Sequence, residues 1–162
     1  MENIKRLVIV LKSQVNLYSE LLDLMASEKQ AIVTWSVDKT VEITKKKDEL
    51  LRKEGIQSEA RNALLSKIAV DQNAPSVKIS DVIGIAKSEG MDITDELINL
   101  RDRIAELIPQ IHAENLSLKM LYATNNRLIN DFFTQTGLGD ALSGGYGPSG
   151  RQKRASTIRK LV

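Results

Sequence analysis

The sequence predicts an all-α protein, an elongated antiparallel helical bundle or coiled coil of two to three long helices and one short helix, with a flexible C-terminal tail. Long segments repeat apolar residues at alternating steps of three and four, as paired helices do. Six of the nine glycines follow Phe133, which indicates a break in the helical body there. Aromatic residues make up only 4% of the chain, which argues against a β-sandwich.

The first long helix is expected over residues 1–35, a stretch without Gly or Pro. Its apolar stripe holds the heptad spacing for about four heptads and is interrupted once, by Lys29. The stripe comprises Ile4, Val8, Leu11, Val15, Tyr18, Leu22, Met25 and Ile32.

A second helix is expected from about Val37 to Val70, with a less regular stripe. Gly55 lies in the middle of the segment, so a kinked or split helix is an alternative to a continuous one. Residues 71–79 read as a loop, and a short helix should follow and end at Gly90. The predicted stripe of the second helix comprises Val37, Val41, Leu51, Leu65 and Ile68.

The last helix should begin near Asp92 or Thr94 and run for about 40 residues, with a kink at Pro109. Neither long stripe can be buried by one helix alone, so we expect the helices to pair as an antiparallel bundle. A parallel coiled-coil dimer would fit the same stripes. The stripe of the last helix comprises Ile93, Leu97, Leu100, Ile104, Leu107, Ile111, Leu118, Leu121, Asn125, Ile129 and Phe132.

The charge distribution supports two domains, a helical bundle at residues 1–136 and a Gly-rich basic tail at 137–162. Five of the 23 basic residues and none of the 21 acidic ones follow Gly150. Residues 1–149 therefore carry a net charge of −3. We expect a mildly acidic helical body with a flexible basic tail.

The composition leaves little material for catalysis or metal binding. The chain has no Cys and one His, His112, which excludes disulfides and thiolate metal sites. Acidic residues near the start of the last helix alternate with Arg101 and Arg103, which favours a solvated face of ion pairs over a catalytic pair. No P-loop pattern occurs. We expect no enzyme activity, no cofactor and no metal.

The N-terminal segment does not resemble a targeting signal. Its apolar run from Leu7 to Leu11 ends at Lys12, shorter than the roughly seven to 15 residues of a signal peptide. A membrane span needs about 20 apolar residues. We therefore expect a cytoplasmic protein without stable membrane insertion.

Aromatic residues at the end of the last helix suggest an interaction surface. Phe132 and Phe133 lie about 100° apart on a helix, so we expect that one core does not bury both completely. The basic tail has three open interpretations: a contact for nucleic acid or anionic lipid, a solubilising charge, or a segment that folds on a partner. The third uses Ile158 and Leu161, which share one helical face.

Three motifs in order resemble the FlgN-like flagellar type III export chaperone family. They are a long segment at 28–65, NNRLINDFF at 125–133 and GYGPSG at 145–150, and the resemblance covers essentially the whole chain. It implies a cytosolic chaperone that binds the C-terminal segments of hook–filament junction (hook-associated) proteins. Such a chaperone prevents premature assembly and delivers its clients to the export gate of the type III apparatus.

The resemblance also implies site residues. Asn126, Leu128 and Ile129 match the family's Asn followed by an apolar pair, and Tyr146 matches its tail motif. We expect Tyr146 to dock on the export gate. The expected client-binding residues are Asn126, Leu128, Ile129, Phe132, Phe133, Ile158 and Leu161.

A function of another class remains open, a coiled-coil adaptor whose basic tail binds nucleic acid or anionic membrane. Phosphate contacts weaken steeply with salt, whereas an apolar grip on a client does not. The chaperone interpretation expects no nucleic acid partner.

Overall fold

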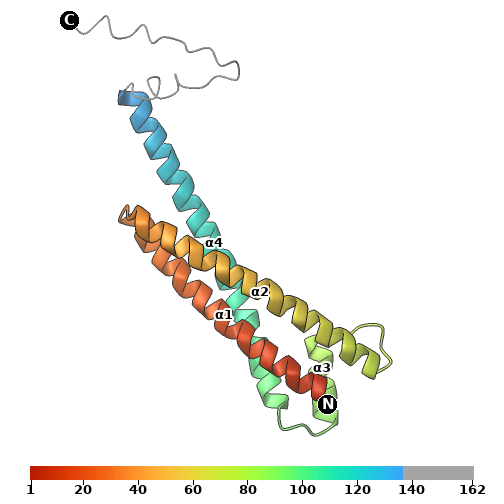
Figure 1. The fold of residues 1–162 in the computed structure, drawn as a ribbon. Coiled ribbons are helices and arrows are strands. Elements are labelled where there is room, and N and C mark those ends of the chain that lie inside the picture. The colour runs from red at the N-terminus through yellow and green to blue at the C-terminus, as the bar shows by residue number, and fades with distance from the viewer. Residues whose placement is uncertain (137–162) are drawn as a thin grey trace, which may run out of the picture. The chain divides into compact units, whose positions relative to one another are not determined.

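The computed structural model describes residues 1–136, which form four helices joined by short connections (Figure 1). Within this range there is no strand, which confirms the all-α prediction. Three helices are long and one is short, as expected. In chain order they are α1 (Glu2–Val33), α2 (Val37–Asp71), α3 (Ile79–Ser88) and α4 (Thr94–Thr136).

The described chain divides into two units, Met1–Leu118 and a second that begins at Lys119. The first unit holds α1, α2, α3 and the first part of α4. The second holds the remainder of α4. The predicted boundary between a bundle domain at 1–136 and a tail at 137–162 stays a prediction.

Helices α1 and α2 lie side by side as an antiparallel hairpin (Figure 1). Their side-chain contacts run in opposite chain order, because Asn3 meets Asp71 near one end while Glu28 meets Lys47 near the other. The predicted α1 stripe faces the interior. Ile4, Val8, Leu11, Tyr18, Met25 and Ile32 are buried, and Val15 and Leu22 are partly buried.

The face predicted for α2 is wrong over its first half. Val37, Val41 and Leu51 are exposed, whereas Leu50 and Ile68 are buried. At about 100° per residue, the exposed three lie well away from the face that contacts α1. The helix runs through Gly55 without a break, which favours the continuous alternative.

Helix α3 and the start of α4 close one end of the hairpin. Val82, Ile83 and Ala86 of α3 belong to the same buried cluster as Leu7 and Leu11 of α1. From α4 the cluster takes Leu97, Ile104 and Leu107. The four helices of the first unit therefore share one core, and α4 continues as helix on both sides of Pro109.

Three helices end in the same way, with a residue in the left-handed region just past the C-cap. These residues are Trp35 (φ 54°), Asn73 (φ 52°) and Gly90 (φ 63°). In each case the next residue donates its N–H back to the helix, for example Met91 N to Ala86 O at 2.9 Å, which is the Schellman pattern. Gly90 confirms the predicted end of the short helix.

Polar residues inside the hairpin are paired across it. The Gln14 side chain is fully buried and donates from Nε2 to Ser58 Oγ at 3.4 Å. The Tyr18 hydroxyl donates to Glu54 Oε1 at 2.9 Å. Glu28, only 2% exposed, holds Lys47 Nζ at 2.5 Å. Because a buried polar group without a partner is costly, these pairs favour one register of α1 on α2.

No helix among the described residues combines the length and the apolarity that crossing a bilayer requires.

Candidate functional site

The acidic residues of early α4 form surface ion pairs. Lys12 of α1 reaches Glu96 at 2.6 Å, and within α4 Arg103 reaches Glu106 at 3.0 Å. His112 is exposed. Over residues 1–136 no group of three or more His, Cys, Asp or Glu side chains is placed to hold a metal ion. This arrangement agrees with the solvated face inferred from the alternation of charges.

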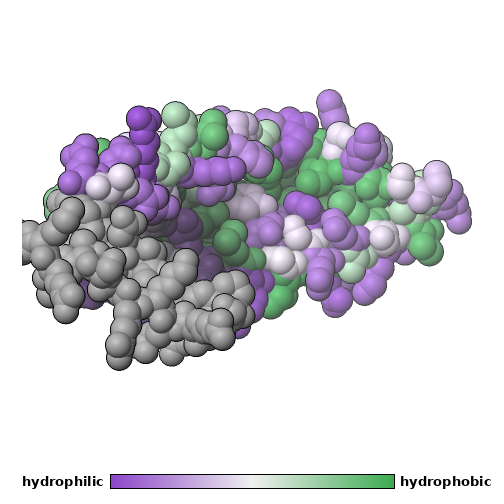
Figure 2. All heavy atoms as spheres, turned by 90° about the horizontal axis from the view of Figure 1, so that it is seen from above, coloured by the Kyte–Doolittle hydropathy of each residue, from purple (hydrophilic) through white to green (hydrophobic). Residues whose placement is uncertain are grey.

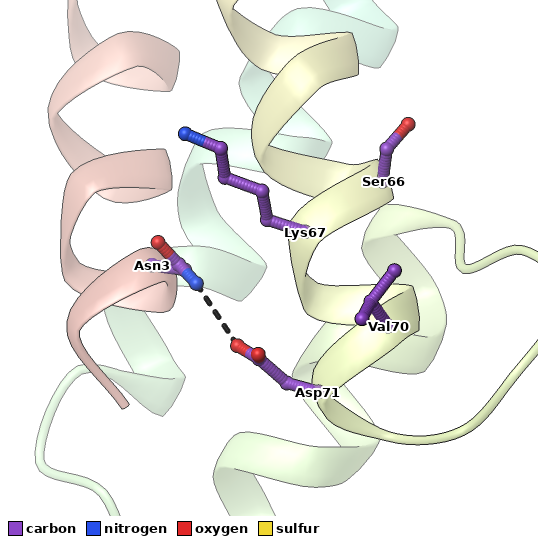
Figure 3. Close-up of a pocket in the computed structure, with 5 residues that line it drawn as sticks. All are labelled: Asn3, Ser66, Lys67, Val70 and Asp71. Carbon is purple, nitrogen blue, oxygen red and sulfur yellow. Dashed lines mark hydrogen bonds between the residues drawn. The ribbon is translucent and has the colours of Figure 1, made fainter.

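An open hollow lies between the start of α1 and the end of α2 (Figure 3). The side chain of Asn3 donates from Nδ2 to Asp71 Oδ2 at 2.9 Å, which ties the first turn of α1 to the last turn of α2. Ser66, Lys67, Val70 and Asp71 are all exposed and Asn3 is half-buried. None of these side chains is fully buried.

The second unit presents a helix with exposed apolar side chains. Leu128 is 55% exposed, Ile129 38% and Phe132 59%. Residues three and four apart share a helix face, so these three side chains lie together. Leu121 and Asn125 lie on the same face and are half-buried. The segment thus carries an apolar face along the four turns before the end of α4.

The remaining predicted site residues fall into two groups. Asn126 is exposed and lies on a neighbouring face of α4, about 100° from Asn125. Phe133 belongs to α4, but its side chain lies outside the described residues, as do Tyr146, Ile158 and Leu161. The structure therefore places Leu128, Ile129 and Phe132 on one side of α4, with Asn126 three residues before Ile129. That any of these residues binds a client stays a prediction.

The apolar face of the second unit continues the stripe that is buried in the first. Leu97, Ile104, Leu107 and Leu118 are at most 7% exposed. Beyond Leu118, the stripe of α4 continues with the same alternating steps of three and four residues. These positions are Leu121, Asn125, Leu128 and Phe132. One continuous heptad stripe is thus buried along the early part of α4 and exposed near its end.

A second exposed apolar patch, which was not predicted from the sequence, lies at the turn between α1 and α2. Val33 and Trp35 are each 58% exposed and Val37 is 70% exposed. The sequence signal that could have revealed this patch is Trp35, which lies between two helical segments at a place without Gly or Pro. Apolar residues also reach the surface among hydrophilic ones on the face shown in Figure 2. Exposed apolar patches of this kind mark interaction surfaces.

These features define a class of protein. An all-helical body over residues 1–136 and an exposed apolar stripe on a long helix are features of helical binding proteins.

Comparison with known proteins identifies the family. A family model described as FlgN protein matches residues 1–154, so the chain belongs to the FlgN family. This is a family of flagellar export chaperones and not of enzymes. The resemblance drawn from the three sequence motifs is thereby confirmed. Neither the curated proteins nor the solved structures include a match to the chain.

Proposed function

We propose that this chain is a cytosolic chaperone for flagellar hook–filament junction proteins. It binds their C-terminal segments, prevents premature assembly and delivers them to the type III export apparatus. The observation that carries the proposal is the exposed apolar stripe near the end of α4, in a chain of a flagellar export chaperone family. A client kept from assembling must have its own apolar surface covered, and this stripe offers a matching face.

The energetics of the stripe suit a reversible complex. Fully burying one large apolar side chain is worth about 1.5–3 kcal/mol. Leu128, Ile129 and Phe132 are each at least 38% exposed, so a client can still bury much of their surface. Part of this gain offsets the cost of ordering the client segment. We therefore expect a complex of moderate affinity that can release its client.

The proposed client-binding surface extends beyond the described residues. On α4 we include Asn126 and Phe133. From the tail we include Ile158 and Leu161, because these two residues share an apolar face if the tail folds as a helix on the client. Deleting residues 137–162 should then weaken client binding while leaving the helical content of the body unchanged. Equal affinity of the truncated and complete chains would contradict a role for the tail.

We assign Tyr146 to docking on the export gate rather than to folding or client binding. Tyr146→Ala should leave both the circular dichroism of the body and client affinity unchanged, and should reduce binding to the gate component. Melting of the body by this substitution would show that the assignment is wrong.

The proposal is tested by co-elution of the full-length chain with C-terminal segments of hook–filament junction proteins, at low and high salt. We expect a salt-resistant complex, because apolar contacts are weakly screened. Retention on DNA or on anionic vesicles at low salt only, without a client complex, would instead support the adaptor with a basic tail.

A further inference from the structure

In the first unit, polar residues in the apolar stripes or inside the hairpin meet polar groups on a facing helix. Lys29, the interruption of the α1 stripe, faces Glu114 on the stripe of α4, with Nζ and Oε2 3.6 Å apart. The buried Gln14 meets Ser58 of α2 at 3.4 Å. Helix pairing here therefore matches polar to polar and apolar to apolar positions, which fixes the register of each pair.

Asn125 is the polar interruption of the same stripe further along α4. It lies four residues after Leu121 and three before Leu128, in step with the heptad positions. Its side chain is half-buried. Within residues 1–136, no hydrogen bond reaches that side chain. A single asparagine at a core position of paired helices is known to select register and partner at a cost in stability.

From this we propose that Asn125 sets the register of the bound client, by hydrogen bonding to one polar side chain on an otherwise apolar face of a client helix. The inference rests on the proposed function and specifies the chemistry of its partner. An amphipathic helix is the occupant that fits, because α4 already pairs with helices along the earlier part of this stripe. A helix also satisfies its own backbone hydrogen bonds when its apolar face is covered.

The pairing supplies discrimination between clients. A helix that places an apolar residue opposite Asn125 leaves the asparagine amide buried without a partner, and a helix shifted by one turn does the same. Such an unpaired buried group weakens binding by about tenfold or more. Client helices with the polar residue at the matching position are therefore preferred, although the stripe itself is apolar.

The test is a double-mutant cycle on the full-length chain and a C-terminal segment of a hook–filament junction protein that co-elutes with it. On the chaperone side the variant is Asn125→Leu, with Asn130→Leu as the matched control. Asn130 is exposed and lies about 140° from Asn125 around the helix. On the client side, each polar residue on the apolar face of the segment is replaced in turn by Leu.

We expect Asn125→Leu to weaken binding of the unchanged segment by about tenfold. One of the Leu-substituted segments should recover that loss when paired with Asn125→Leu and should bind the unchanged chaperone less well. Asn130→Leu should bind every segment as the unchanged chain does. Circular dichroism of each variant establishes that the helices remain intact.

Two results would overturn the inference while leaving the proposed function standing. One is Asn125→Leu binding the unchanged segment equally or more tightly, with no coupling to any client residue. The other is that the free chain forms a homodimer and that Asn125→Leu, but not Asn130→Leu, alters this dimer. That result would show that a second copy of the chain covers the stripe near Asn125. If no junction-protein segment binds the unchanged chain, the proposed function fails and the inference falls with it.

Discussion

Lys29 of α1, which is exposed, and Glu114 of α4, which is half-buried, face each other in the first unit, with Nζ and Oε2 separated by 3.6 Å. Each occupies a position where the heptad stripe of its helix would place an apolar residue. The Oε2 atom of Glu114 is buried and lies beyond hydrogen-bond distance of a partner. The two interruptions thus meet as a loose ion pair, which matches α1 to α4 in one register without contributing much stability.

Replacing this pair with leucine should stabilise the protein. Lys29→Leu alone should lower the free energy of unfolding by about 0.5–1 kcal/mol, because it leaves a buried carboxylate oxygen without a cation. The loss of stability is small because both side chains are more than a third exposed. The double variant Lys29→Leu with Glu114→Leu should match or exceed the unchanged chain. Urea denaturation of both variants tests this, and a double variant less stable than the unchanged chain would contradict it.

The Glu28–Lys47 pair at the other side of the hairpin is much more buried. Glu28 is 2% and Lys47 17% exposed, so Lys47→Met should lower the free energy of unfolding by about 2–4 kcal/mol, because it removes a cation that faces a buried carboxylate. The control is Lys46→Met, which removes only an exposed pair with Glu42 and should change stability little. Equal effects of the two substitutions in urea denaturation would show that burial does not govern the pair.

Tyr18 should titrate far above an ordinary tyrosine. Burial, followed by the hydrogen bond to Glu54 and the charge of its carboxylate, raises the pKa of the Tyr18 phenol from 10.0 to about 12. Because the folded state retains this proton where the unfolded state has lost it, the associated stability is complete below pH 10 and is lost as the pH rises towards 12.

The measurement is the phenolate absorbance of the unchanged chain minus that of Tyr18→Phe, recorded while circular dichroism reports the folded state. The difference should rise near pH 12. A midpoint near pH 10 in the folded protein would contradict the buried hydrogen bond to Glu54.

Two glycines around α3 should respond to alanine in opposite ways. Gly84 lies inside the helix and Gly90 has φ 63°, and a Cβ at either position meets nothing within 4 Å. Gly84→Ala should raise the free energy of unfolding by about 0.5–1 kcal/mol through helix propensity. Gly90→Ala should lower it by about 1 kcal/mol through backbone strain. Thermal denaturation of the two variants should therefore shift in opposite directions; a stabilising Gly90→Ala would contradict the left-handed turn.

The sequence was most informative where one face of a helix is buried along its whole length. The stripe from Ile4 to Ile32 could be predicted because α1 contacts several other helices, so its buried positions dominate the pattern. Early α2 has little buried surface of its own. Its exposed Val37, Val41 and Leu51 therefore have the spacing of a buried stripe. Spacing alone does not distinguish an exposed apolar stripe from a buried one.

The break between the first two helices was expected between residues 35 and 37 and lies there, but the conformation of the turn could not be predicted. Left-handed positions after a helix are usually Gly or Asn, as Gly90 and Asn73 are, whereas here Trp35 holds φ 54°. The apolar patch around Trp35 was missed with it. On α4 the predicted Leu128, Ile129 and Phe132 are exposed together, because helical spacing alone places them. The ion pair between Lys29 and Glu114 needed the packing of two distant segments, which periodicity does not give.

The central claim is that the exposed stripe near the end of α4 holds the client. The most direct measurement compares two leucines of α4, Leu128 at 55% and Leu116 at 61% exposed, about 120° apart around the helix. Each is changed to Asp in the full-length chain, and binding of a junction-protein C-terminal segment is measured by titration calorimetry. We predict that Leu128→Asp weakens binding at least about tenfold, because a charge then replaces an apolar contact, while Leu116→Asp binds as the unchanged chain does. Unchanged binding by Leu128→Asp, or an equal loss in both variants, would contradict the account.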